Sequence, residues 1–139
     1  MSPRRDRIDR ATQRAGDDMD RAKAQLAEAS RQVEANDSER RQMLEASGRL
    51  GSDEMSSQLR THLAGAGARR LGQLLEEKGR LTANEAESRA EMEAAHVRLR
   101  ALERLVARVD AADADERRRV AANDLQDLVA TRAVRDDGR

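Results

Sequence analysis

Apolar side chains recur from Ile8 onward at alternating spacings of four and three residues, and the positions between them are mostly charged or polar. This alternation is the heptad seam of a coiled-coil helix. The first seam consists of Ile8, Thr12, Ala15, Met19, Ala22, Leu26, Ala29, Val33, Asn36, Arg40, Met43, Ser47 and Leu50. Its many alanines bury little area, and the polar seam residue Asn36 is of the kind that fixes helix register.

A second seam with the same alternation occupies the other half of the chain. It consists of Leu74, Lys78, Leu81, Glu85, Ser88, Met92, Ala95, Leu99, Leu102, Val106 and Val109. No large apolar residue follows between Asp110 and Arg119. The pattern then resumes on a shifted seam at Ala121, Leu125, Leu128 and Arg132. Such a shift changes the local supercoil or ends the paired region.

Glycines separate the two seams. Gly48, Gly51, Gly65, Gly67 and Gly72 are five of the eight glycines in the chain. Because glycine is costly inside helices and common at their ends, we predict a helix over about 4–47, a turn region over 48–67 and a helix over about 68–135. A short helix over about 53–64, capped at Ser52, is expected within the turn region.

The predicted fold class is therefore all-α, a long antiparallel two-helix coiled-coil hairpin that forms a single domain over 1–139. An extended helix that pairs with a second copy is the alternative geometry, and the glycines favour the hairpin.

The composition supports long helices. The chain has no Phe, Trp or Tyr, and Ala, Leu, Glu, Arg and Lys make up 79 of its 139 residues, as in coiled coils. The only proline is Pro3, so no proline interrupts the helices. High charge with few large apolar residues also permits disorder, but the regular apolar spacing argues against it.

Charge and residue types exclude several functions. With 27 basic and 27 acidic residues and no aromatic ring, the chain lacks the basic bias and stacking groups of nucleic-acid binders. It has no cysteine, so disulfides and thiolate metal sites are excluded. No apolar stretch is long enough for membrane insertion, and the charged start does not resemble a signal peptide. We therefore expect a cytoplasmic location.

Candidate catalytic and metal motifs are incomplete. Gly67–Gly72 has the glycine spacing of a phosphate loop, but Gln73 stands where the lysine is required, and no strand is expected before it. Asp113–Asp115 begins like a calcium loop without its later acids and glycine. His62 and His96 are far apart in the sequence, with no cysteine to complete a zinc site. We predict no enzyme activity, no catalytic residue, no cofactor and no metal.

Three segments near the C-terminus carry a family pattern. They are Arg100–Leu105 (RALERL), Asp115–Arg119 (DERRR) and Asp124–Arg135 (DLQDLVATRAVR). Together they resemble the C-terminal pattern of the flagellar FliJ family, the stalk-like component of the flagellar type III export apparatus.

The resemblance implies a non-enzymatic stalk and escort protein. Its partners would be the flagellar export ATPase, the cytoplasmic domain of the export gate and the export chaperones. It would lie at the cytoplasmic face of the cell membrane, attached peripherally through the export apparatus. The ATPase-facing residues would be Leu125, Leu128, Val129 and Arg132, with Ile8 and Arg10 beside them across the hairpin.

Other functions fit the same architecture. A generic cytoplasmic coiled-coil adaptor and an injectisome stalk counterpart are both consistent with the pattern. A membrane-surface coil would need bulky apolar anchors on a basic helix, and the Arg-rich start offers only Ile8.

Overall fold

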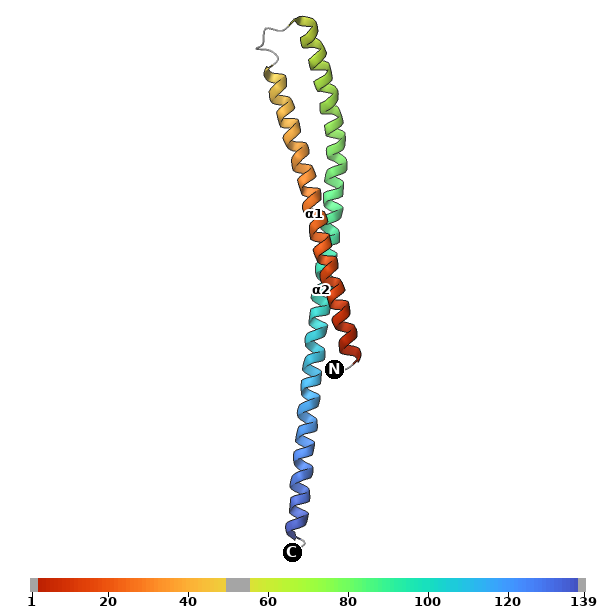
Figure 1. Ribbon diagram of the computed structural model, residues 1–139, viewed down its shortest axis with the longest axis vertical. Coiled ribbons are helices and arrows are strands. Elements are labelled where there is room, and N and C mark those ends of the chain that lie inside the picture. The colour runs from red at the N-terminus through yellow and green to blue at the C-terminus, as the bar shows by residue number, and fades with distance from the viewer. Residues whose placement is uncertain (1–2, 50–55, 138–139) are drawn as a thin grey trace. The chain divides into compact units, whose positions relative to one another are not determined.

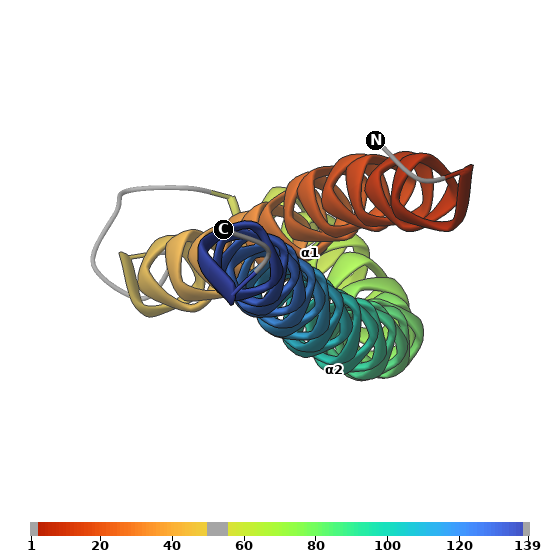
Figure 2. The same ribbon diagram turned by 90° about the horizontal axis from the view of Figure 1, so that it is seen from below.

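The computed structural model describes residues 3–49 and 56–137, and all of these except Ser56 are helical. Helix α1 spans Pro3–Arg49 and helix α2 spans Ser57–Asp137. Each appears as one unbroken coil in Figures 1 and 2, and the described residues contain no strand. The predicted fold class, an all-α two-helix hairpin, is confirmed.

Helix α2 begins with a serine cap. The backbone N–H of Leu59 donates to Oγ of Ser56 at 3.2 Å, and the N–H of Arg60 donates to the Ser56 carbonyl oxygen at 3.0 Å. A serine hydroxyl at this position satisfies an otherwise unpaired N–H of the first turn. The cap predicted at Ser52 lies outside the described residues.

The predicted turn region over 48–67, with a separate short helix over about 53–64, is corrected where the structure describes it. Residues 57–64 are helical as expected, but they belong to α2, and 48–49 and 65–67 are helical as well. Helix α1 continues to Arg49, and α2 already includes residues 57–67. Gly65, Gly67 and Gly72 therefore lie inside α2, not at helix ends, and no described glycine has a positive φ. An interior glycine costs a helix about 1 kcal/mol relative to alanine but keeps its N–H, so helix-forming neighbours can carry α2 through it.

The chain divides into two compact units: 17–97 forms one, and 1–16 together with 98–139 forms the other. They are described separately below as the central unit and the terminal unit.

In the central unit the two helices run antiparallel. The side-chain N–H of Asn36 (Nδ2) donates to the backbone carbonyl oxygen of Leu74 at 3.0 Å. Further along α1, Glu39 accepts from Nη2 of Arg70 at 2.8 Å. Moving forward from 36 to 39 on α1 thus moves backward from 74 to 70 on α2, and these two contacts define the register.

The core of the central unit follows the predicted seams. Leu74 is the most deeply buried large side chain, with 1% of its surface exposed. The buried residues of this unit all occupy predicted seam positions: Met19, Ala22, Ala29, Asn36, Leu74, Ser88 and Ala95. Among the described seam positions of this unit, Ser47 and Lys78 stay exposed, and Leu50 lies outside the described residues. Alternation in the sequence therefore located nearly the whole interface.

The terminal unit contains a shorter paired region. Ile8 and Ala15 of α1 and Val109 of α2 are buried there. Nε of Arg5 lies 3.3 Å from Oδ1 of Asp110, and Nη1 of the same arginine lies 3.1 Å from Asp9. The start of α1 is thereby placed beside Asp110, where the buried positions of α2 end.

Candidate functional site: an uncovered face of α2

The residues of α2 that follow Asp110 have no helix beside them in the terminal unit (Figure 1). We call residues 111–137 the C-terminal segment. Every residue of the segment is exposed except Ala114, which is half-buried. Because the described part of α1 starts two residues before Arg5, which already pairs with Asp110, α1 does not extend along this segment.

Local interactions support the helix in this segment. Arg118 pairs with Asp115 at 2.6 Å, and Arg119 pairs with Glu116. The hydroxyl of Thr131 donates to the carbonyl oxygen of Asp127 at 2.8 Å. Pairs three or four residues apart on an exposed helix contribute about 0.2–0.5 kcal/mol each.

Three large aliphatic side chains of the segment form an apolar face in contact with solvent. Leu125 is 63% exposed, Leu128 68% and Val129 62%. Their spacing of three and four residues places them on one side of the helix, and Arg132 follows one turn later on the same side. Together with Thr131 and Arg135 they line a shallow depression. We call this surface the uncovered face.

The uncovered face points away from the side of α2 that packs on α1. Val109 marks the packed side, and Leu125 lies 16 residues later. At 3.6 residues per turn, this separation rotates Leu125 by about 160° from Val109. By the same geometry the exposed residues Val120 and Val134 lie within about 20° of the packed side. Leu128 lies about 100° from Val109 by the same count, so a partner on the uncovered face would approach α2 from outside its packed side.

The expected placement of Ile8 and Arg10 beside the C-terminal residues is wrong. Ile8 is 8% exposed and belongs to the buried seam, while Arg10 is exposed and donates from Nε to the carbonyl oxygen of Asp6 at 3.4 Å. The two helices differ in length, 47 residues against 81, so α1 reaches its described start opposite Asp110. Leu125 lies 15 residues further along α2, about 22 Å at 1.5 Å per residue. That Leu125, Leu128, Val129 and Arg132 bind a partner stays a prediction.

Sequence reasoning missed a second apolar depression in the central unit. It lies between the helices near their connection and is lined by Met43, Ala46, Ser47, Leu63, Ala64, Gly67 and Leu71. The assignment of 48–67 to a turn hid it. Continuing the α2 seam backward from Leu74 in steps of three and four reaches Leu71, Gly67 and Ala64, so the signal was present in the spacing.

Metal binding, membrane crossing and phosphate binding were considered for the described residues in turn. Across residues 3–49 and 56–137, no group of three His, Asp or Glu side chains is arranged to hold a metal ion. Over the same ranges, neither helix contains an apolar stretch suited to crossing a membrane. The glycines of Gly67–Gly72 are part of a regular helix, without the preceding strand that a phosphate loop requires.

Protein-family models, curated proteins and solved structures were compared with this chain, and none of them matches it.

Proposed function

We propose that this chain is a non-enzymatic stalk and escort component of the flagellar type III protein export apparatus. In this role it binds the export ATPase ring, the cytoplasmic domain of the export gate and export chaperones. It is held at the cytoplasmic face of the cell membrane through these partners.

The uncovered face is the observation that carries the proposal. Leu125, Leu128 and Val129 expose more than 60% of their surfaces, whereas among the described seam residues up to Val109 only Ser47 and Lys78 are exposed. Large aliphatic side chains gathered on one exposed face indicate a binding surface. These residues fall within Asp124–Arg135, one of the segments that resemble the FliJ family. A helix-on-helix contact is the recognition mode that such spacing serves.

ATP hydrolysis by the flagellar export ATPase of the same organism tests the proposal. We expect the purified chain to stimulate hydrolysis and to promote assembly of the ATPase ring at stoichiometric amounts. The double variant Leu125→Asp/Leu128→Asp should abolish both effects, because it places two charges in the contact. Its helicity should be retained, since both side chains are exposed.

Val120→Asp/Val134→Asp is the matched control. It introduces the same two carboxylates in the same segment, at exposed valines on the packed side of α2. We expect it to stimulate the ATPase as the parent chain does. Failure of the parent chain to stimulate or co-elute with the ATPase would reject the stalk function, and equal loss in both double variants would reject the assigned face.

The second apolar depression supports a different role, that of a generic coiled-coil adaptor. It provides a binding surface in the central unit in addition to the one in the terminal unit, as a protein that links two partners needs. Capture of two partners, with neither of them an export ATPase, would favour this role.

A further inference from the structure

The two helices of the central unit meet in one regular register. Asn36 donates to the carbonyl oxygen of Leu74, and Cε of Met43 lies 3.8 Å from the position that a Cβ on Gly67 would take. A heptad forward on α1 thus corresponds to a heptad backward on α2. Continued along the unit, this count gives a series of layers at heptad intervals: Met43 with Gly67, Asn36 with Leu74, Ala29 with Leu81, and Ala22 with Ser88.

Alanines that recur at heptad spacing make these layers interchangeable. If α1 moves by one heptad toward the connection between the helices, Ala29 comes level with Leu74 and Ala22 comes level with Leu81. Each of these layers again joins one alanine to one leucine, so the paired side-chain volume is the same as in the observed layer of Ala29 with Leu81. The movement is about 10 Å at 1.5 Å per residue.

The alternate layers of the seam do not favour the observed register either. The count places Val33 next to Lys78 and Leu26 next to Glu85, so each aliphatic side chain has a charged residue beside it. After the movement, Val33 lies next to Leu71 and Leu26 lies next to Lys78. One of the two mixed pairs thereby becomes a pair of aliphatic side chains, whose burial is favourable.

A move of one heptad in the opposite direction is disfavoured. It brings Arg40 next to Lys78, which places two like charges in the seam. The movement toward the connection is compatible with the chain length, because seven residues separate Arg49 from Ser57 and an extended chain of that length reaches about 23 Å. We call the register reached by this movement the second register.

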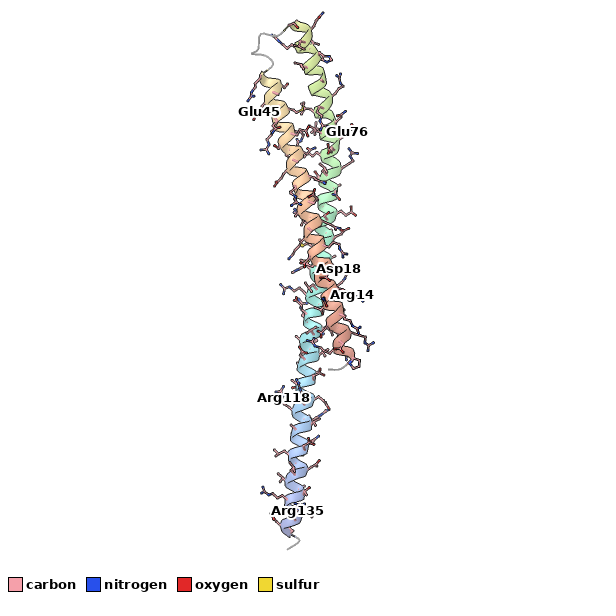
Figure 3. The ribbon with its side chains drawn as sticks, in the orientation of Figure 1. Arg14, Asp18, Glu45, Glu76, Arg118 and Arg135 are labelled. Carbon is pink, nitrogen blue, oxygen red and sulfur yellow. The ribbon has the colours of Figure 1, made fainter. Side chains whose placement is uncertain are left out.

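Asn36 does not choose between the two registers. Figure 3 shows the side chains along both helices of this unit, with Glu45 of α1 and Glu76 of α2 labelled. Asn36 donates to a backbone carbonyl oxygen, and in the second register the carbonyl of Gly67 takes the place of the carbonyl of Leu74. A polar seam residue of this kind keeps the helices in steps of a whole heptad.

An ion pair at the edge of the interface does distinguish the registers. Nη2 of Arg70 lies 2.8 Å from Oε1 of Glu39, and Nε of Arg70 donates to the same oxygen at 3.0 Å. In the second register Arg70 is level with Gln32, which has no charge. Because α1 is one continuous helix, the same movement also separates Arg5 from Asp110 in the terminal unit.

We propose that the central unit has two registers one heptad apart and that the ion pair of Glu39 with Arg70 holds it in the observed one. The side chains of Glu39 and Arg70 are 44% and 43% exposed, so a charged group of a partner has access to both. A partner that binds either charge favours the register in which the pair is broken. Binding at the side of the hairpin is thereby converted into a displacement of α1 along α2. This inference does not depend on the export role.

Cysteine cross-linking distinguishes the registers, because the chain has no cysteine of its own. Gln25 and Asn84 are exposed and stand in the same relation as the ion pair, two heptads away along each helix. The variant Gln25→Cys/Asn84→Cys therefore reports the observed register. Gln25→Cys/Glu77→Cys reports the second register, and Gln25→Cys/Glu91→Cys is the matched control for the disfavoured direction.

Each variant is treated with a short bis-maleimide at low protein concentration, and the initial rate of cross-linking within one chain is measured on denaturing gels. We expect Gln25→Cys/Asn84→Cys to react fastest and Gln25→Cys/Glu77→Cys to react faster than the matched control. Adding Glu39→Arg should raise the rate of the second-register pair relative to the observed-register pair about fivefold or more, because attraction to Arg70 becomes repulsion. Adding the charge swap Glu39→Arg/Arg70→Glu should return this ratio to that of the parent chain.

Three outcomes would overturn the proposal. The first is an unchanged ratio in the Glu39→Arg background. The second is an equal acceleration of all three cross-links, which would indicate loosened pairing of the helices. The third is a ratio that the charge swap does not restore, since the effect would then come from the arginine at position 39 and not from the broken ion pair. Circular dichroism should show the same helicity in every background, because the side chains of the pair are largely exposed.

Discussion

The central unit and the C-terminal segment have similar helix-forming residues and opposite environments. In the central unit, Leu74 is 1% exposed and Asn36 is 5% exposed between two helices. In the C-terminal segment, Leu125 is 63% exposed on a part of α2 beside which the described residues of its unit place no other helix. Both regions follow a spacing of three and four, so the pattern alone does not distinguish a seam that is paired from one that is free.

The difference shows which interactions hold each region. Burial of apolar surface stabilises the central unit, whereas the C-terminal segment depends on helix propensity and on local pairs such as Arg118 with Asp115. Most helices in proteins gain their stability from packing of an apolar face. The C-terminal segment therefore has the lower local stability. A partner that buries its apolar face would stabilise it.

The largest expected effect comes from truncating a leucine in each region. Leu74→Ala should lower the free energy of unfolding by about 2–4 kcal/mol, because it removes a fully buried side chain and leaves a cavity. Leu125→Ala should change it by less than about 0.5 kcal/mol, as for exposed positions generally. Urea denaturation followed by circular dichroism measures both. Equal losses would mean that Leu125 is buried in the folded chain.

A polar residue of the seam gives the next largest effect. Asn36→Ala removes the hydrogen bond to the Leu74 carbonyl oxygen and the one that Asn36 accepts from Nε of Arg40 at 3.0 Å. We expect a loss of about 1–2 kcal/mol, since these bonds lie within a largely buried layer. Asn123→Ala in the exposed segment is the control and should be nearly neutral. The same urea titration decides whether Asn36 stabilises the pairing as well as setting its register.

The sequence predicted the fold and most of the seam because a heptad pattern depends only on which residues face a neighbouring helix. It failed at Gly65 and Gly67, where a helix tolerates glycine at a modest cost. It also failed at Ile8 and Arg10, because the pattern does not determine how far each helix extends past its partner. That extent depends on the register of the two helices, which contacts such as Arg5 with Asp110 define. A heptad pattern stays in phase when one helix slides along the other by a heptad, so the pattern does not determine the register.

Glycine substitutions separate helix propensity from packing. An added Cβ at Gly79 would have no atom within 4 Å outside its own helix turn. Gly79→Ala should therefore raise the free energy of unfolding of the central unit by about 0.5–1 kcal/mol, mainly by restricting the unfolded chain. Thermal denaturation measures this gain.

The reverse change, Ala130→Gly, applies the same difference in propensity to the C-terminal segment. It should speed amide hydrogen exchange there without lowering the main unfolding transition, because the segment opens on its own. A lowered main transition would show that the two regions unfold together.

The smallest effect concerns a type of ion pair that both regions contain, between residues three positions apart on one helix. Glu28, an exposed residue of the central unit, accepts from Nη2 of Arg31 at 2.6 Å and from Nε at 3.1 Å. This hydrogen bonding and the positive charge of Arg31 hold the pKa of Glu28 below its ordinary 4.5, with a smaller contribution from Gln32. A lowered folded-state pKa stabilises the protein above the unfolded-state value, and this contribution is lost as pH falls through the folded-state pKa. Carboxyl chemical shifts followed by NMR should therefore show Glu28 titrating below 4.5, with Arg31→Met moving its midpoint upward more than Gln32→Ala does.

The pair of Glu28 with Arg31 has the same i,i+3 spacing as Asp115 with Arg118. Such a pair can form on any exposed helix, whether or not another helix packs beside it. An unchanged midpoint in Arg31→Met would show that the pair between Glu28 and Arg31 is not formed in solution.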